Sequence, residues 1–283
     1  MTGAGIHHVE LGARSLERSR DFYAGLLGLP EVPAPEPGTG RPSAWFAAQG
    51  ALLKVVELGE DATTGEWVDD DLQAGMRHVG LKIGDVDAGI RRLEAAGVEV
   101  LSAPADVLGG VRIAFFLDPD GSRLEYVQGS LDYQSVRSPA LAVAERAAAP
   151  GRADGPRFDH VGLTVTDLAA ALDYYCGTFD YQVIGDIRHV DDARGFLMTY
   201  LHGEGGVLEV FSFDVPTSAA PVVRPADAGL RGLGLLPPED VALDGTAADL
   251  SVAGSGGWYT GSGPDGVRVT LVPASAVGAG GVR

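Results

Sequence analysis

The sequence has few cysteines, few basic residues and no long apolar run. A single cysteine, Cys176, can form no disulfide within the chain and has no second thiol with which to share a metal ion. The 21 Lys and Arg residues stand against 39 Asp and Glu residues, and the resulting formal charge of −18 argues against nucleic acid as a partner. No stretch of about 18 apolar residues could span a bilayer, and no signal-peptide pattern is present. We therefore expect a soluble, cytoplasmic protein without a membrane partner.

One pattern recurs along the 283 residues, of which 45% are hydrophobic, enough for two domains with their own cores. The copies begin at "IHHVEL", "MRHVGLKIGDVDAGI" and "RFDHVGLTVTDLAAA", and a reduced copy begins at "LRGLGLLPPED". Their aligned positions are His8, His78, His160 and Gly232. The longest interval contains an Ala-, Pro- and Arg-containing segment, which predicts a linker over 138–156 between domains at 1–137 and 157–283.

Each copy reads as a strand, a helix and further strands. "IHHVEL" alternates with the two-residue period of a half-buried strand, and the apolar residues that follow recur at helical spacing. Ser15, Asp85 and Asp167 stand where helix N-caps are expected. The sequence thus predicts an α+β fold of four βαβββ modules, paired around shared clefts as two tandem domains. The fourth copy is the weakest assignment, because residues 237–256 show little helical periodicity.

Strand periodicity also indicates which histidine of the first copy faces a cleft. Alternate side chains share a face, so His8 and Glu10 point to one side of the strand and His7 to the other. The position of His8 is again histidine in the second and third copies, whereas that of His7 is Arg77 or Asp159. We therefore predict that His8 faces the cleft.

The final strands of the four copies align a second position, occupied in turn by Lys54, Glu125, Glu209 and Thr270. If the first two copies pair, their cleft contains His8, His78 and Glu125. Two imidazoles and a carboxylate suit one divalent ion of iron, manganese, nickel, cobalt or zinc. The second pair would offer only His160 and Glu209, which make a poor metal site.

The repeated histidine strands, with the turn and strand "DPDGSRLEYVQG", resemble the vicinal-oxygen-chelate (VOC) superfamily, which includes glyoxalase I, extradiol dioxygenases, methylmalonyl-CoA epimerase and bleomycin-binding proteins. The resemblance covers nearly the whole chain as two tandem glyoxalase-like domains. It implies a metal ion that binds adjacent oxygen atoms of a small-molecule substrate and polarises them. It also implies His8, His78 and Glu125 as the metal ligands.

Two departures from the family affect the expected reaction. Where glyoxalase I has a fourth, carboxylate ligand that doubles as a catalytic base, the first pair of copies has Lys54. We therefore expect an isomerase, epimerase or lyase in which Glu10 is the general base and Lys54 its electrostatic partner. A salt bridge of Glu10 with Lys54 or Lys82 is the structural alternative.

Extradiol dioxygenases in this family carry an acid-base histidine and a tyrosine shortly before the carboxylate ligand. The segment before Glu125 has neither, and Phe115 stands about where the tyrosine would fall. An Fe(II)-dependent dioxygenase and a non-catalytic, antibiotic-binding resistance protein stay open as alternatives. Trp258 and Tyr259 could line a ligand pocket of the latter or fill a core. Pairing of modules between two chains would give a homodimer.

Overall fold

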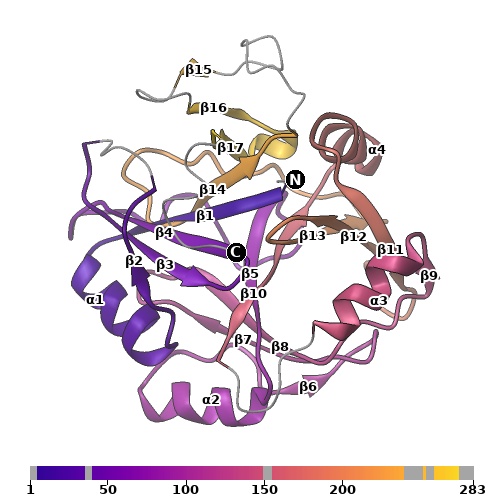
Figure 1. Ribbon diagram of the computed structural model, residues 1–283, viewed down its shortest axis with the longest axis horizontal. Helices are drawn as coiled ribbons and strands as arrows, with labels where there is room; N and C mark the ends of the chain where they lie inside the picture. Colours follow the sequence, from indigo (N-terminus) through magenta and orange to yellow (C-terminus); the bar gives the residue numbers. More distant parts are fainter. Residues whose placement is uncertain (1–4, 36–39, 149–154, 239–250, 253–257, 274–283) are drawn as a thin grey trace.

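The computed structural model describes residues 5–35, 40–148, 155–238, 251–252 and 258–273. Two mixed β-sheets, of eight and nine strands, form its centre (Figure 1). In spatial order, the eight-stranded sheet contains β15 (Ser251–Val252), β16 (Tyr259–Ser262), β17 (Arg268–Leu271), β14 (Gly229–Leu236), β1 (Gly5–Ala13), β4 (Ala51–Glu57), β3 (Ser43–Ala48) and β2 (Glu31–Val32). The nine-stranded sheet contains β6 (Ala105–Asp106), β7 (Arg112–Leu117), β8 (Arg123–Gln128), β5 (Gly75–Lys82), β10 (Arg157–Thr164), β13 (Gly206–Phe213), β12 (Phe196–Gly203), β11 (Gln182–His189) and β9 (Ser135–Val136).

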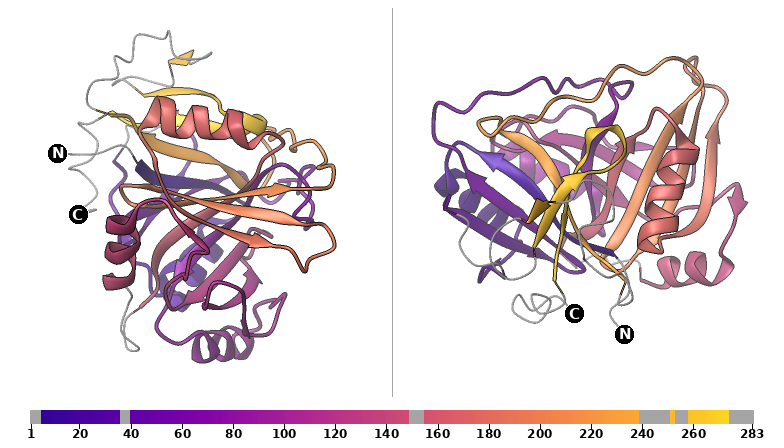
Figure 2. Two further views of the ribbon diagram at one scale, coloured as in Figure 1. Left: turned by 90° about the vertical axis from the view of Figure 1, so that its right-hand side faces the viewer. Right: turned by 90° about the horizontal axis from the view of Figure 1, so that it is seen from above.

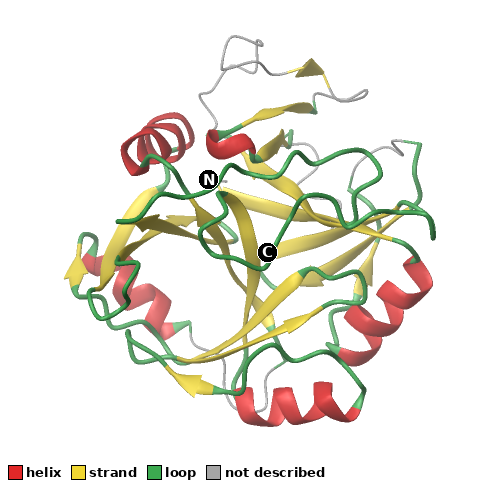
Figure 3. Cartoon of the chain, turned by 180° about the vertical axis from the view of Figure 1, so that it is seen from behind, coloured by secondary structure: helices red, strands yellow, loops and turns green. Residues whose placement is uncertain are grey.

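The helices lie at the periphery of the strands (Figure 2, Figure 3). They are α1 (Leu16–Arg20), continued by the π-helical η1 (Asp21–Leu26), α2 (Val86–Ala95), α3 (Pro139–Ala147), α4 (Leu168–Leu172), continued by the π-helical η2 (Asp173–Thr178), and the 3-10 turn η3 (Pro264–Gly266). The predicted N-caps Ser15, Asp85 and Asp167 are confirmed, because each side chain accepts a backbone N–H from the first turn of its helix. Helix α3 lies within the expected linker segment. None of these helices is long and apolar enough to cross a membrane.

The α+β fold of paired modules is confirmed, but the modules pair differently from the expectation. Strand β1 of the first module pairs antiparallel with β14 of the fourth, and β5 of the second pairs with β10 of the third. Each sheet therefore combines modules from both halves of the chain. Most of the weakly assigned segment 237–256 lies outside the described residues.

Glycines opposite the histidines explain this pairing. Along β5 and β10, His78 lies opposite Gly162 and His160 lies opposite Gly80. A Cβ atom on either glycine would stand 2.2 Å from a carbon of the opposing imidazole ring, so a larger residue leaves no room for that ring. The first copy has Glu10 at the corresponding position and cannot accept a histidine there.

The reduced fourth copy supplies the glycine that β1 needs. Gly234 lies opposite His8, and a Cβ atom at Gly234 would meet the His8 ring at 2.0 Å. Gly232, in turn, lies opposite Glu10. The missing side chain of Gly234 thus makes room for His8, whereas a Cβ atom at Gly232 would meet the backbone of Arg268 on β17.

The other faces of the paired central strands form the hydrophobic core. Val79 and Leu81 of β5 and Val161 and Leu163 of β10 are at most 1% exposed, and α2 packs against the neighbouring β7 and β8. Burying each such side chain contributes roughly 1.5–3 kcal/mol. A slip of one residue in register would move the histidines into this core, so the apolar alternation fixes the face on which they lie.

Candidate metal centre

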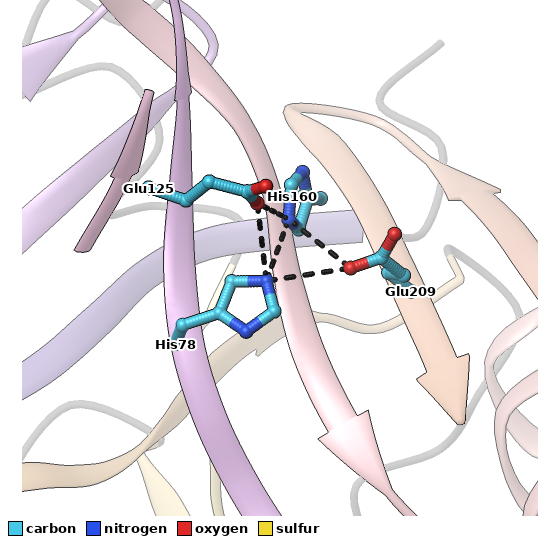
Figure 4. Close-up of side chains that lie close together, drawn as sticks. All are labelled: His78, Glu125, His160 and Glu209. Atoms are coloured by element: carbon cyan, nitrogen blue, oxygen red, sulfur yellow. Dashed lines mark hydrogen bonds and ion pairs between the residues drawn. The ribbon is translucent and has the colours of Figure 1, made fainter. Parts of the chain in front are cut away.

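Four side chains from the second and third modules converge in the nine-stranded sheet (Figure 4). His78 on β5 and Glu125 on β8 meet His160 on β10 and Glu209 on β13, and we call these four residues the His–Glu cluster. Each is at most 6% exposed, and their donor atoms lie within 4.8 Å of one another. The backbone pairings Gly80 with Glu125 and Gly162 with Glu209 set the carboxylates beside the histidine strands.

The donor atoms of the cluster have the spacing of a metal coordination shell. The two histidine Nε2 atoms are 2.9 Å apart, Glu125 Oε2 is 3.3 and 3.0 Å from them, and Glu209 Oε2 is 3.3 Å from both. Bonds of about 2.0–2.2 Å from nitrogen or oxygen to a first-row divalent ion place neighbouring donors about 3 Å apart. Two carboxylates balance the charge of such an ion, so the cluster can hold one divalent metal.

The charges of the cluster shift the pKa values of its side chains in the direction opposite to the effect of burial. Burial lowers the pKa of His160, but the Glu209 charge, a hydrogen bond to Asp159 and the Glu125 carboxylate hold that pKa well above its usual value. Burial raises the pKa of Glu125, and hydrogen bonds from His160 and His78 outweigh this effect and lower the pKa to about 2. Without a metal the cluster is thus an ion-paired group, from which an incoming metal must displace a proton.

The two histidines have different surroundings at their second ring nitrogen. His160 Nδ1 lies 3.1 Å from the Asp159 carboxylate, which Lys82 Nζ contacts at 3.0 Å. An Nδ1–H donated to Asp159 leaves the Nε2 lone pair directed at the metal position. Lys82 also lies 3.7 Å from Glu145 on α3, so the linker helix is connected to the site. His78 Nδ1 has no hydrogen-bond partner among the described residues.

Replacing Asp159 with asparagine is expected to weaken metal binding by about 10- to 100-fold, because the His160 ring loses the carboxylate that orients it. Metal titration by calorimetry measures the change. Asp132→Asn is the matched control, because Asp132 pairs with Arg146 in an exposed salt bridge. An unchanged affinity in Asp159→Asn would show that Asp159 does not orient the ligand.

A cavity of about 170 Å³ adjoins the His–Glu cluster and includes its four side chains in the wall. The wall is largely aliphatic and aromatic, and its aromatic members are Phe115, Phe196, Tyr200 and Phe211. Its polar members beyond the cluster and Tyr200 are Asp71, Arg123, Asp159 and His189. A concave apolar site with a few convergent polar groups is the usual form of a small-molecule site.

His189 is the histidine of this cavity that lies outside the His–Glu cluster, and it forms no ion pair within the described residues. Its ring stacks on Phe196 with centroids 4.3 Å apart, and its buried Nε2 has no hydrogen-bond partner among the described residues. Burial lowers the pKa of His189 and outweighs the opposing charges of Asp192 and Glu209. The imidazole is therefore neutral at pH 7 and able to accept a proton.

The structure brings the expected ligands His78 and Glu125 together and places His8 elsewhere. His8 lies on β1 in the eight-stranded sheet, 1% exposed, with its ring 5.0 Å from that of Trp45. It is not in the cluster because β1 pairs with β14 and not with β5. His7 is also buried, with its Nδ1 2.9 Å from that of His8. Trp258 lies in a small apolar cluster near both histidines.

The expected base, Glu10, and its expected partner, Lys54, also lie in the eight-stranded sheet. They form the salt bridge that was the structural alternative, with Lys54 Nζ 3.0 Å from Glu10 Oε2. Arg231 contacts Glu10 at 3.2 Å, and Arg268 contacts it as well. Burial raises the pKa of Glu10, but the charges of Lys54, Arg268 and Arg231 hold it below its usual value. Neither Glu10 nor Lys54 is among the described residues that line the cavity.

Replacing Glu10 with glutamine is expected to destabilise the fold by about 3–5 kcal/mol, because buried cations lose their carboxylate. The pKa of Glu10 is lowered on folding, so its contribution is present above the unfolded value of about 4.5 and is lost as the pH falls through the folded pKa. Urea unfolding at pH 7 and in acid should therefore show a difference that shrinks in acid. Glu17→Gln, on the exposed side of α1, is the control. Metal content should not change, and a loss of metal in Glu10→Gln would contradict this structural role.

The sequence of the chain matches a known superfamily in both of its halves. The model of the Glyoxalase/Bleomycin resistance protein/Dioxygenase superfamily matches residues 5–126 and 157–273. The chain belongs to this superfamily. The first matched segment contains the first and second modules of this VOC protein, and the second segment contains the third and fourth.

The individual relatives have low sequence identity to the chain. The chain is 30% identical over 174 residues to "Anthracycline biosynthesis protein DnrV" of Streptomyces peucetius, in an alignment that covers 60% of this chain and 58% of that protein. It is 28% identical over 132 residues to lactoylglutathione lyase of Neisseria meningitidis serogroup A, covering 46% of this chain and 94% of that protein. The solved structure of glyoxalase I from Zea mays has a TM-score of 0.67 at 17% identity, covering 97% of this chain and 94% of that one, which is a likeness of fold.

Proposed function

We propose that the chain is a divalent-metal-dependent enzyme that transfers a proton on a small oxygenated substrate, as an isomerase, epimerase or lyase. The observation that carries this proposal is the set of two histidines and two glutamates at the wall of an apolar cavity. The resemblance to glyoxalase I implies a fourth, carboxylate ligand, and Glu209 offers the carboxylate that Lys54 could not. The relatives named for lactoylglutathione lyase and for anthracycline biosynthesis support a small-molecule substrate.

Each residue of the site has a distinct part in this proposal. When bound, the metal ion acts as a Lewis acid that makes a C–H bond next to a substrate carbonyl more acidic. His189 accepts the proton at its Nε2, which has no hydrogen-bond partner among the described residues, and returns it to the product. Asp159 holds the His160 ring in place, and the apolar wall excludes water, which strengthens the charge interactions inside the cavity.

Proton exchange on a simple probe tests this function without knowledge of the natural substrate. 2-Hydroxyacetophenone carries a carbonyl and a hydroxyl oxygen on adjacent carbons and an exchangeable CH₂ group. The chain, loaded separately with Mn, Fe, Co, Ni or Zn, is expected to catalyse exchange of this CH₂ in deuterium oxide, followed by proton NMR. The metal-free chain and Glu209→Gln at equal concentration are expected to be slower. A fully metal-loaded chain that does not accelerate exchange would contradict the proposal.

A second candidate, an Fe(II)-dependent extradiol-type dioxygenase, is favoured by two residues of the cavity. His189 and Tyr200 precede Glu209 in the sequence and line the cavity, whereas the segment before Glu125 offers neither residue type. An acid-base histidine and a tyrosine before the carboxylate ligand are what the dioxygenase resemblance requires. Oxygen uptake by the anaerobically Fe(II)-loaded chain with catechol, lost on oxidation of the iron, would favour this candidate over proton transfer.

A further inference from the structure

We propose that the substrate of the cavity is a flat aromatic molecule whose oxygenated edge lies next to the His–Glu cluster and that carries no anionic group at its other end. This inference rests on the proposed function and adds the substrate class. It follows from three properties of the cavity, namely its aromatic wall, its charges and its size.

Aromatic rings flank the metal-binding end from both modules. The ring of Phe115 on β7 lies 5.4 Å from that of His78, and the ring of Phe211 on β13 lies 6.2 Å from it. Phe196 continues this wall, with its ring 5.9 Å from Phe211 and stacked on His189. Aromatic pairs prefer offset-stacked and edge-to-face contacts, so rings at several orientations favour a flat, rigid aromatic guest over a flexible chain.

The charges of the cavity disfavour an anionic substrate. Besides the two cluster glutamates, Asp71 and Asp159 line the wall. Arg123 is the one Lys or Arg residue among the described lining residues. Its guanidinium forms ion pairs with Asp69 at 3.0 Å and Asp71 at 2.8 Å. A carboxylate on the far end of the substrate would lose hydration and would meet no unpaired Lys or Arg among the described lining residues. Anionic peptide thiol adducts are therefore disfavoured.

The size of the cavity limits the part of the substrate that it encloses. Its volume of about 170 Å³ is below the range of roughly 300–1,000 Å³ of pockets for drug-sized ligands. A cavity of this volume can enclose one ring system together with its oxygenated edge. The inference therefore concerns the portion of the substrate next to the His–Glu cluster.

Hydroxamic acids test the substrate class, because they share one pair of adjacent oxygens and differ in the attached group. The metal-loaded full chain is titrated by calorimetry with acetohydroxamic, cyclohexanecarbohydroxamic and benzohydroxamic acids, and with the monohydroxamic acid of succinic acid, which carries a carboxylate. We expect benzohydroxamic acid to bind about 2- to 10-fold more tightly than the cyclohexane compound. The succinic compound should bind about tenfold or more weakly than benzohydroxamic acid.

A pair of variants assigns the preference to the cavity wall. Phe196→Leu should remove most of the preference for the aromatic compound over the cyclohexane compound. Phe46→Leu, on β3 of the eight-stranded sheet and outside the described lining, is the matched control and should keep the preference. A loss of preference in both variants would show that it does not come from this wall and would overturn the assignment.

Metal content, measured on the same samples, separates the two levels of failure. If the chain holds one metal and binds the aromatic and saturated compounds equally, or binds the succinic compound most tightly, the substrate class is wrong and the proposed function stands. If the chain holds no metal and binds no hydroxamic acid, the proposed function fails, and the substrate class fails with it.

Discussion

Replacing His160 with alanine is expected to abolish metal binding, and replacing His8 with alanine is expected to leave one metal ion per chain. His160 contributes one of four donor atoms of the cluster, whereas His8 lies in the other sheet. Loss of a residue that only orients a ligand weakens affinity by about 10- to 100-fold, so loss of the ligand itself should exceed about 100-fold. Mass spectrometry of protein purified without a His-tag gives the metal content, and calorimetric titration gives the affinity.

The comparison of the two histidine variants separates the loss of a metal ligand from a general loss of stability. His160→Ala leaves the Glu125 and Glu209 carboxylates without their buried cation, so it should destabilise the metal-free chain more than His8→Ala does. Both replacements remove a buried imidazole from a central strand, so some loss of stability is common to both. Thermal unfolding without metal measures that common effect. Retention of metal in His160→Ala with its loss in His8→Ala would place the ion in the eight-stranded sheet, as the resemblance alone implied.

Local periodicity in the sequence was enough to predict the first strand of each module, the helix N-caps and the alignment of equivalent positions among the modules. The aligned position occupied by Lys54, Glu125, Glu209 and Thr270 is one structural position. Its residues pair with Glu10, Gly80, Gly162 and Gly234, which are themselves aligned two positions after the histidine or glycine of each copy. Each of these features depends on residues close together in the chain, and a repeat displays it several times.

Which modules pair depends on contacts between residues far apart in the chain. This pairing determines which of the candidate metal ligands come together. Adjacent copies were expected to pair, which separated His78 and Glu125 from His160 and Glu209. A signal for the observed pairing is nevertheless present in the sequence. The second and third copies read "HVG", with the glycine that an opposing histidine needs, whereas the first reads "HVE" and its histidine requires the second glycine of "GLG" in the fourth. The match between a histidine on one strand and a glycine on the opposing strand becomes visible only when the copies are tested as paired strands.

His189 could not be found from the repeat, because it has no counterpart that the alignment of copies singles out. It becomes a candidate through its place in the cavity and the lack of a partner for its Nε2 among the described residues. A titratable group of this kind beside a metal-binding cluster is where proton transfer is expected.

Replacing His189 with glutamine is expected to slow proton exchange on 2-hydroxyacetophenone by about 10²- to 10⁴-fold, with metal content unchanged. Glutamine keeps hydrogen-bonding groups but cannot take up a proton near neutral pH. The pKa of His189 is lowered by burial, so the neutral form that accepts the proton predominates above a pKa below 6.5. The exchange rate of the native chain should therefore rise with pH through that pKa and level off above it, and this rise should be absent from His189→Gln.

His202→Gln is the matched control for this experiment. His202 lies on β12 outside the described cavity lining, and burial lowers its pKa as well, so its replacement should leave both the rate and the pH profile unchanged. An exchange rate in His189→Gln equal to that of the native chain would mean that another group accepts the proton. The carboxylate of Glu209 then becomes the candidate, because it lies in the wall of the same cavity.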